Sequence, residues 1–186
     1  NRCERPLNKD KKALDLPNAY LYKQQLITNL KKEQLAGDFP NGTVGMPLGL
    51  NVYEMYPFWT TFWNQLGYRV LLSPFGSKQL FTKGQYTIPS DTICYPAKLI
   101  HGHIEWLLEK NVDFIFYPCL SYNFDEEISD NHYNCPVVAY YPQVIEANVG
   151  KIDKEKYLFG FYGVHNKKFM KKQLTKDLAK RLGTNG

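Results

Sequence analysis

The sequence lacks any segment that would place the protein in a membrane or mark it for export. No apolar run approaches the ~18 residues that a transmembrane helix needs, and no signal-peptide pattern opens the chain. We therefore expect a cytoplasmic protein with no membrane partner. Apolar residues make up 44% and charged residues 22% of the 186 residues, a balance that excludes a disordered chain and provides for a folded core.

Cysteine is scarce and widely spaced. The four cysteines are Cys3, Cys94, Cys119 and Cys135. This spacing excludes a compact disulfide scaffold, and without an export signal the thiols are expected to stay reduced. No C-x-x-C pair occurs, which excludes the zinc-ribbon and ferredoxin patterns. The role of the thiols therefore depends on where the fold places them.

The common nucleotide and hydrolase motifs are also missing. The Gly-rich segment 45–49 matches neither the P-loop nor the dinucleotide fingerprint, and neither G-x-S-x-G nor H-E-x-x-H occurs. The net charge of +5 is modest, and the lysines near residues 167–181 are interpreted as the solvated face of a terminal helix. Basic residues do not alternate with stacking aromatics, so no nucleic-acid partner is expected.

What the sequence does contain is an alternation of short apolar runs with helical stretches. Strands are expected at 44–50, 68–72, 112–117 and 137–141, and helices at 57–66, 77–83, from 96 onward and at 167–182. This order predicts a doubly wound α/β fold with a mainly parallel sheet and helices on both faces. Residues 1–40 are interpreted as a junction with one helix, and residues 41–186 as the α/β domain of a longer protein.

Special residues follow the predicted strands, where open α/β sheets bind their ligands. Cys94 precedes a helix, whose dipole favours a thiolate there; Cys119 follows the strand at 112–117; and Cys135 follows an acidic loop at 121–134. Two interpretations remain open, a shared cluster or metal site and inert buried cysteines. Because Cys135 directly precedes a predicted strand, a purely parallel sheet would place it at the opposite edge.

Four further side chains on the helix that begins near Pro96 have ordinary explanations. His101 and Glu105 share a face and are expected to form a solvated hydrogen bond. His103 borders the apolar face and is expected to be a packed histidine. Lys98 is one turn from Cys94 and is expected to be solvated, although it could meet an anion there.

Four motifs occur together in this chain: GMPLGLNVYEMYPFW at 45–59, CYPAKLIHGHI at 94–104, FYPC at 116–119 and NHYNCP at 131–136. In this order they resemble the dehydratase-like domain of large 2-hydroxyacyl-CoA dehydratase activator (activase) proteins. The resemblance covers roughly residues 43–148, and the start of the chain is similar to the junction that follows the activase module.

The resemblance implies an iron–sulfur function. In that family the domain is fused behind an ATPase module, and related dehydratase subunits hold a [4Fe–4S] cluster through three cysteines, from which one electron starts a radical dehydration. Carried over to this chain, Cys94, Cys119 and Cys135 match the cysteine motifs and become the candidate cluster ligands. The implied partners are the ATPase module of the same polypeptide and a 2-hydroxyacyl-CoA dehydratase-like subunit.

Two other functions remain open. The first is a clusterless docking or regulatory domain that recognises a dehydratase or an acyl-CoA. Exposed aromatic side chains would support it, and the candidates are Tyr53, Tyr56, Phe58 and Trp59. The second is a zinc site that uses the same cysteines with His132. We expect no turnover from this chain alone.

Overall fold

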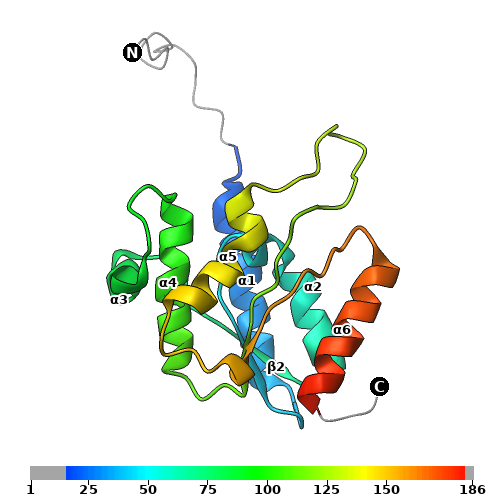
Figure 1. The fold of residues 1–186 in the computed structure, drawn as a ribbon. Coiled ribbons are helices and arrows are strands. Elements are labelled where there is room, and N and C mark those ends of the chain that lie inside the picture. Colours follow the sequence, from blue (N-terminus) through cyan, green and yellow to red (C-terminus); the bar gives the residue numbers. More distant parts are fainter. Residues whose placement is uncertain (1–15, 183–186) are drawn as a thin grey trace.

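Four short strands form one parallel sheet in the order β2-β1-β3-β4. Helices lie on both sides of this sheet (Figure 1). The computed structural model describes residues 16–182. The strands are β1 (Thr43–Met46), β2 (Arg69–Leu72), β3 (Phe114–Phe116) and β4 (Tyr157–Leu158). Every pairing is parallel, so each strand needs a crossover connection, and helices supply it. The predicted doubly wound α/β fold is confirmed.

Six helices surround the sheet: α1 (Ala19–Ala36), α2 (Asn51–Gln65), α3 (Lys78–Gly84), α4 (Tyr95–Leu108), α5 (Pro136–Asn148) and α6 (Lys167–Leu182). Two short 3-10 turns, η2 (Gln85–Thr87) and η3 (Lys154–Lys156), complete the described elements. In residues 16–182, no helix is long and apolar enough to cross a membrane.

One face of the sheet is covered by α2 and α6 through aromatic packing. The ring of Trp59 lies 4.8 Å from that of Phe116, and Trp63 packs edge-to-face on both Phe114 and Phe116. Tyr162 stacks on Phe116, and its hydroxyl donates to Asp177 of α6 at 2.9 Å. Offset and edge-on aromatic pairs add to the stabilisation from buried area, so this cluster fixes α2 and α6 against the sheet.

The opposite face is covered by α4 and α5. A Cβ placed on Gly45 of β1 would meet Leu107 of α4 at 3.1 Å. In the next strand pair, Ile115 is in register with Tyr157, whose hydroxyl donates to the carbonyl of Pro142 in α5 at 3.0 Å. Because paired residues of parallel strands point to the same face, both helices lie on this side of the sheet.

The predicted strand at 137–141 is wrong, because this segment is the first part of helix α5. The run Val137–Tyr141 is apolar and β-branched at its start, and over five residues periodicity does not distinguish a buried strand from a buried helix. The buried positions Ala139, Pro142 and Ile145 recur every three residues, which is helical spacing. The fourth strand is β4, which the sequence analysis did not predict.

Helix α2 also begins earlier than position 57. Asn51 and Glu54 have the three-residue spacing of a capping box, but the N-cap residue is Leu50 and no side chain caps the helix. Glu54 instead accepts from Lys23 of α1 at 2.6 Å, and Pro57 lies inside the helix. Leu50 has φ 48° and ψ −130°, a conformation that glycine adopts freely and leucine rarely does.

Candidate functional site

The candidate site lies at the carboxyl edge of the sheet, at the top of Figure 1. Helix α2 connects β1 to β2, which lies beside β1 on one side. Helix α4 leads from β2 to β3, which lies beside β1 on the other side. The strand order therefore reverses between β1 and β3, and such switch points open a crevice that binds ligands in α/β proteins. The 121–134 loop projects from this edge beside it (Figure 1).

A cavity of about 520 Å³ occupies this crevice. Leu50 and Asn51 at the start of α2, Leu120 after β3 and Val138 of α5 form its body side, and the 121–134 loop forms most of the remainder. The volume falls in the range of small-molecule sites. Sequence patterns indicate the segments around this crevice but not the cavity, because a loop and three segments distant in sequence form its walls.

All three candidate thiols lie at this edge. Cys94 is the N-cap residue of α4 and Cys135 is the N-cap residue of α5, with φ and ψ of −62° and 150° and of −60° and 153°. Both thiols are exposed, and neither helix has a side-chain cap hydrogen bond. Cys119 follows β3 and is buried, and its N–H donates to the carbonyl of Gly160 at 2.9 Å. Cys3 lies outside the described residues.

Because residues 137–141 form a helix and not a strand, Cys135 is not placed at the opposite edge of the sheet. A helix that leads from one parallel strand to the next begins at the carboxyl edge, so Cys135 shares that edge with Cys94 and Cys119. The three thiols are nevertheless not a preformed ion site. Among residues 16–182, no group of three His, Cys, Asp or Glu side chains could hold a metal ion. Thiols are the donors that iron–sulfur clusters use, and these three share one edge of the sheet, but they are not assembled around a single ion.

Two buried tyrosines, Tyr141 and Tyr117, lie near enough to Cys94 and Cys119 to interact with them electrostatically. Burial, with a smaller contribution from Cys94, raises the pKa of Tyr141 to about 12. Burial also raises the pKa of Tyr117 well above its usual value, with contributions from Cys119 and Tyr141. The pKa of the Cys119 thiol rises to about 12 because it is buried, so in this state the thiol stays protonated at neutral pH. The buried surroundings of Tyr117, Cys119 and Tyr141 therefore oppose additional negative charge.

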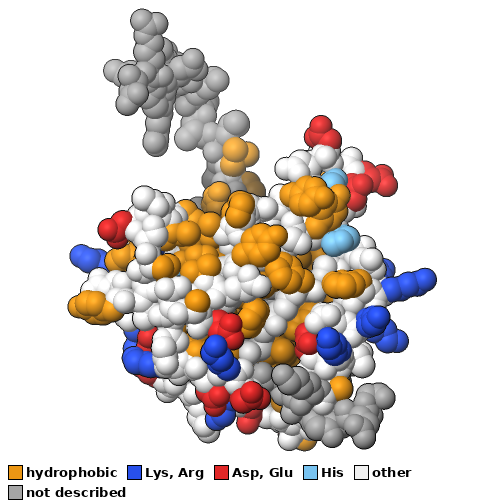
Figure 2. Space-filling model, viewed as in Figure 1, with side chains coloured by type: hydrophobic (Ala, Val, Ile, Leu, Met, Phe, Trp, Pro, Cys, Tyr) orange, Lys and Arg blue, Asp and Glu red, His pale blue; other side chains and the backbone are white. Residues whose placement is uncertain are grey.

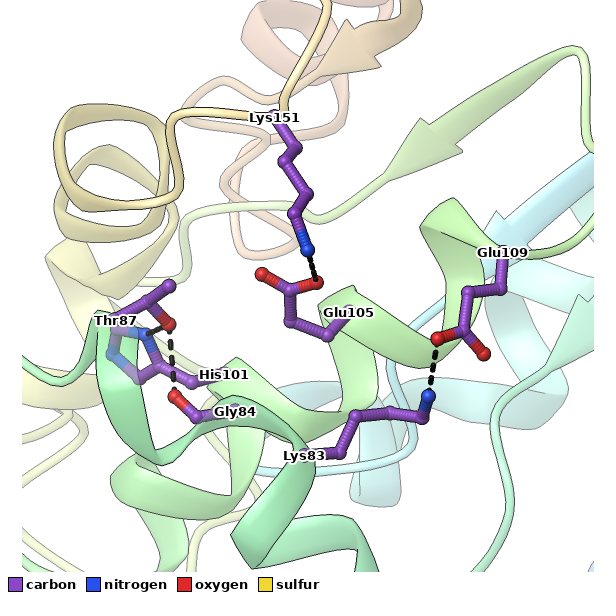
Figure 3. Close-up of polar contacts among 7 residues, drawn as sticks. All are labelled: Lys83, Gly84, Thr87, His101, Glu105, Glu109 and Lys151. Carbon is purple, nitrogen blue, oxygen red and sulfur yellow. Dashed lines mark hydrogen bonds and ion pairs between the residues drawn. The ribbon is translucent and has the colours of Figure 1, made fainter.

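His101 is fully buried and bonds on one side to Thr87 in the turn after α3 (Figure 3) and on the other side to Tyr141. The hydroxyl of Thr87 donates to the carbonyl of Gly84 at 2.9 Å, so its oxygen accepts from Nδ1–H of His101 at 2.8 Å. Burial lowers the pKa of His101 to about 4, and the neutral ring leaves Nε2 to accept from the hydroxyl of Tyr141 at 2.9 Å. The predicted solvated bond between His101 and Glu105 is therefore wrong.

The other predicted side chains have partners of their own. Glu105 pairs with Lys151 at 3.1 Å (Figure 3), and Lys98 donates to the carbonyl of Asp91 at 2.7 Å. His103 is the packed histidine that the sequence predicts, and its Nδ1 lies 2.7 Å from the hydroxyl of Ser73. Nε2 of His132, the possible zinc ligand, lies 3.4 Å from Oδ1 of Asp125.

Changing Tyr141 to phenylalanine tests the His101 arrangement. The variant removes the O–H that bonds to Nε2 and leaves a buried acceptor without a partner, so we expect a loss of about 1–3 kcal/mol in the free energy of unfolding. Urea denaturation at pH 7.5 measures it. Tyr140→Phe is the matched control, because the neighbouring Tyr140 is exposed, and we expect a change within about 0.5 kcal/mol. Equal losses in the two variants would contradict the arrangement.

Comparison with known proteins decides the family. A family model described as CoA enzyme activase uncharacterised domain (DUF2229) matches residues 43–186. The chain belongs to this family. The match begins at the first residue of β1 and includes the whole sheet, the switch-point cavity and the three thiols of this activase-family domain. The searches of curated proteins and of solved structures return no match.

The matched region of the activase-family domain does not include helix α1. This helix nevertheless packs on the edge strand β2, where the side-chain oxygen of Gln34 accepts from the N–H of Val70 at 3.1 Å. Lys31 of the same helix donates to the carbonyl of Ser73 at 2.9 Å. The helical extension expected before the domain is therefore attached to the sheet that carries the site.

Proposed function

We propose that this activase-family domain binds a [4Fe–4S] cluster through Cys94, Cys119 and Cys135 and takes part in electron transfer during the activation of a 2-hydroxyacyl-CoA dehydratase. The observation that carries the proposal is the placement of three thiols, from three separate segments, at the carboxyl edge of one parallel sheet. Clusters of this type are held by cysteine thiolates, and they are wider than a single ion, so their ligands need not converge as closely.

Each thiol contributes in a different way. Cys94 and Cys135 lie at the positive ends of α4 and α5, where the helix dipoles favour the negative charge of a thiolate–iron site. Cys119 is held by its backbone bond to Gly160, and iron must replace its proton on binding. When bound, the cluster would supply a carrier for one electron. Lys98 is bonded to the carbonyl of Asp91 and is not needed for charge balance in this proposal.

The proposed partners are an ATPase module of the same polypeptide and a dehydratase-like subunit, in the cytoplasm. The side chains next to the thiols support a partner that covers them, since Tyr95, Tyr133 and Tyr140 are exposed there. Figure 2 shows hydrophobic side chains over the upper and central part of the view and Lys and Arg mainly along its sides and lower part. No Lys or Arg occurs between Lys110 and Lys151. A covered surface of this kind keeps water from a cluster, which tunes its potential.

Iron and sulfide content after strictly anaerobic reconstitution tests the proposal. We expect near-stoichiometric iron, a brown colour and a broad visible absorption shoulder in the unchanged chain. The variants Cys94→Ser, Cys119→Ser and Cys135→Ser are each expected to lose most of the iron, because three thiolates are the minimum ligand set proposed. Cys3→Ser is the matched control and is expected to retain iron.

The contrary results point to the two alternatives. Full iron retention in all three variants would reject these ligands, and a colourless chain that stays folded without iron would favour the clusterless docking domain. The aromatic residues of the docking hypothesis support it little, because Tyr56 and Trp59 are buried and Phe58 is only 36% exposed. Zinc bound in place of iron would favour the zinc site, for which residues 16–182 show no assembled ligand group.

A further inference from the structure

The 121–134 loop exposes large apolar side chains among carboxylates. Ile128 is 84% exposed and Phe124 is 43% exposed. The acidic loop patch consists of these two residues and four exposed carboxylates, Asp125, Glu126, Glu127 and Asp130. Within residues 16–182, none of the four carboxylates forms an ion pair with Lys or Arg. Apolar side chains open to water beside unpaired charges favour a surface that another protein covers.

Helix α6 carries the opposite charge on its outer side. The basic helix patch consists of Lys167, Lys168, Phe169, Lys171, Lys172 and Lys176, all of them exposed. Four of the lysines recur at intervals of three and four residues, so they share one face of the helix. Phe169 is 49% exposed among them. Asp177, the one acidic residue of α6, accepts from the hydroxyl of Tyr162 and forms no ion pair with these lysines in the described part of the chain.

The two patches lie next to each other on the molecule. The ring of Tyr122, at the base of the loop, is 4.8 Å from the ring of His165, just before α6. Figure 1 shows the loop above the start of α6. Figure 2 shows Asp and Glu at the upper right, where the loop projects, and Lys and Arg below them along the right side. Over the described residues no ion pair joins the two patches, so each is open to a second molecule.

Adjacent patches of opposite charge are self-complementary under two-fold symmetry. A second copy turned by a two-fold axis presents its acidic loop patch to the first copy's α6, and its own α6 to the first copy's loop. Exposed charge pairs contribute little affinity each, but they orient the partners and exclude wrong ones. Burial of Phe124, Ile128 and Phe169 supplies the hydrophobic contribution. A second copy fits better than a foreign protein, because this chain already carries both complementary surfaces.

We propose that two copies of this chain form a two-fold symmetric dimer, in which the acidic loop patch of each copy docks on the basic helix patch of the other. The contact is reciprocal, so it closes at two copies. The inference does not depend on the cluster, since none of the three thiols belongs to either patch.

Sedimentation velocity of the reduced 186-residue chain tests the dimer. At about 10 to 500 µM, the range of weak association, we expect a reversible equilibrium between monomer and dimer in 0.1 M NaCl. Raising the salt to 1 M shortens the Debye length from about 10 Å to about 3 Å, so the dimer Kd should rise about 10-fold or more.

Charge reversal assigns the contact to the two patches. The loop variant Glu126→Lys with Asp130→Lys places like charges opposite α6, and the helix variant Lys168→Glu with Lys172→Glu places like charges opposite the loop. Each variant alone is expected to raise the dimer Kd about 10-fold or more, because both contacts become repulsive. An equal mixture of the two variants should form mixed dimers, since each contact then joins opposite charges. The chain with all four changes keeps the net charge of +5 and should dimerise like the unchanged chain.

Lys32→Glu with Lys78→Glu is the matched control for the helix variant. It causes the same change in net charge through two exposed lysines outside both patches, and the dimer is expected to persist. Circular dichroism checks that every variant is folded. If a single variant does not fold, the salt dependence of the unchanged chain and the chain with all four changes still decide.

Several results would overturn the proposal. An unchanged chain that stays monomeric throughout would leave the acidic loop patch to another protein or to its own α6. A dimer that survives both charge variants would place the contact elsewhere. Loss of dimers in the mixture and in the chain with all four changes would show that the patches do not pair, and growth beyond two copies would contradict the two-fold axis. Iron binding by the thiols is measured separately, so failure here leaves the cluster proposal intact.

Discussion

Gly102→Ala is expected to lower the free energy of unfolding by about 3 kcal/mol or more, because α3 and α4 approach each other through glycine. A Cβ on Gly102 would lie 1.9 Å from the carbonyl oxygen of Leu80, and a Cβ on Gly84 would lie 2.1 Å from the backbone nitrogen of Gly102. In both places the obstacle is backbone, which no side-chain rotation can move, so the helices must separate. Figure 1 shows α3 beside the upper part of α4, the helix that Cys94 begins.

Thermal unfolding followed by circular dichroism measures this effect. For a chain of this size, about 3 kcal/mol corresponds to a fall in Tm of roughly 6–12 °C. Gly150→Ala is the matched control, because a Cβ there meets nothing within 4 Å and φ is not positive, so we expect a change within about 0.5 kcal/mol. A Gly102→Ala chain that melts with the unchanged protein would show that the two helices are not packed this closely.

Acid is expected to destabilise the fold between pH 6.5 and pH 4, because two buried histidines are held neutral. Burial lowers the pKa of His101 to about 4; burial, followed by the charge of Lys31, lowers that of His103 to about 4. In the unfolded chain both titrate near the usual value of about 6.5, so the unfolded state binds more protons as the pH falls through this window. Their stabilising effect is complete above pH 6.5 and is lost progressively toward pH 4.

The size of the acid effect follows from the same linkage. Each histidine contributes at most about 1.4 kcal/mol per pH unit in this window. Between pH 6.5 and 4.5 we therefore expect a combined loss of about 2–4 kcal/mol, measured by urea denaturation at several pH values. His101→Gln and His103→Asn should each reduce the slope by about half, because each removes one titrating ring. Any loss that a variant causes at pH 7.5 cancels in this comparison.

His165→Asn provides the control for the acid experiment. His165 is exposed, so its replacement is expected to leave the slope unchanged. A slope that persists in the chain lacking both buried histidines would assign the acid sensitivity to carboxylates instead. Such a result would also contradict the neutral ring of His101 on which the bond from Tyr141 depends.

Sequence periodicity sufficed where an element was long or strongly patterned. The terminal helix at 167–182, the helix from residue 96 and the three strands after residues 43, 68 and 112 all occur, with differences at their ends. Parallel crossovers follow from that order, since parallel strands cannot be joined by a tight turn. The resemblance carried by four motifs led to the family that the comparison confirms.

Whether a short apolar run forms a strand or a helix was decided only by the tertiary structure. Residues 137–141 have the composition of a strand, yet they form the first part of a helix that packs on the sheet. The fourth strand is Tyr157–Leu158. A strand of two residues is too short for its sequence pattern to predict it. Strand β4 forms because it pairs with the edge of β3 that no other strand occupies. Cys135 therefore lies at the carboxyl edge of the sheet, whereas the predicted strand implied the opposite edge.

Composition and periodicity determined that this chain folds as an α/β domain with three thiols near strand ends, and the resemblance of four motifs led to the activase family. Which groups meet was decided by packing between segments far apart in sequence, as Asn51 with Pro118 and His101 with Tyr141 show. The unpartnered oxygen of Asn51, the neutral state of His101 and the cavity of about 520 Å³ all arise in this way. The physical reason is that hydrogen bonding and burial depend on neighbours in space, and local sequence patterns record only neighbours along the chain.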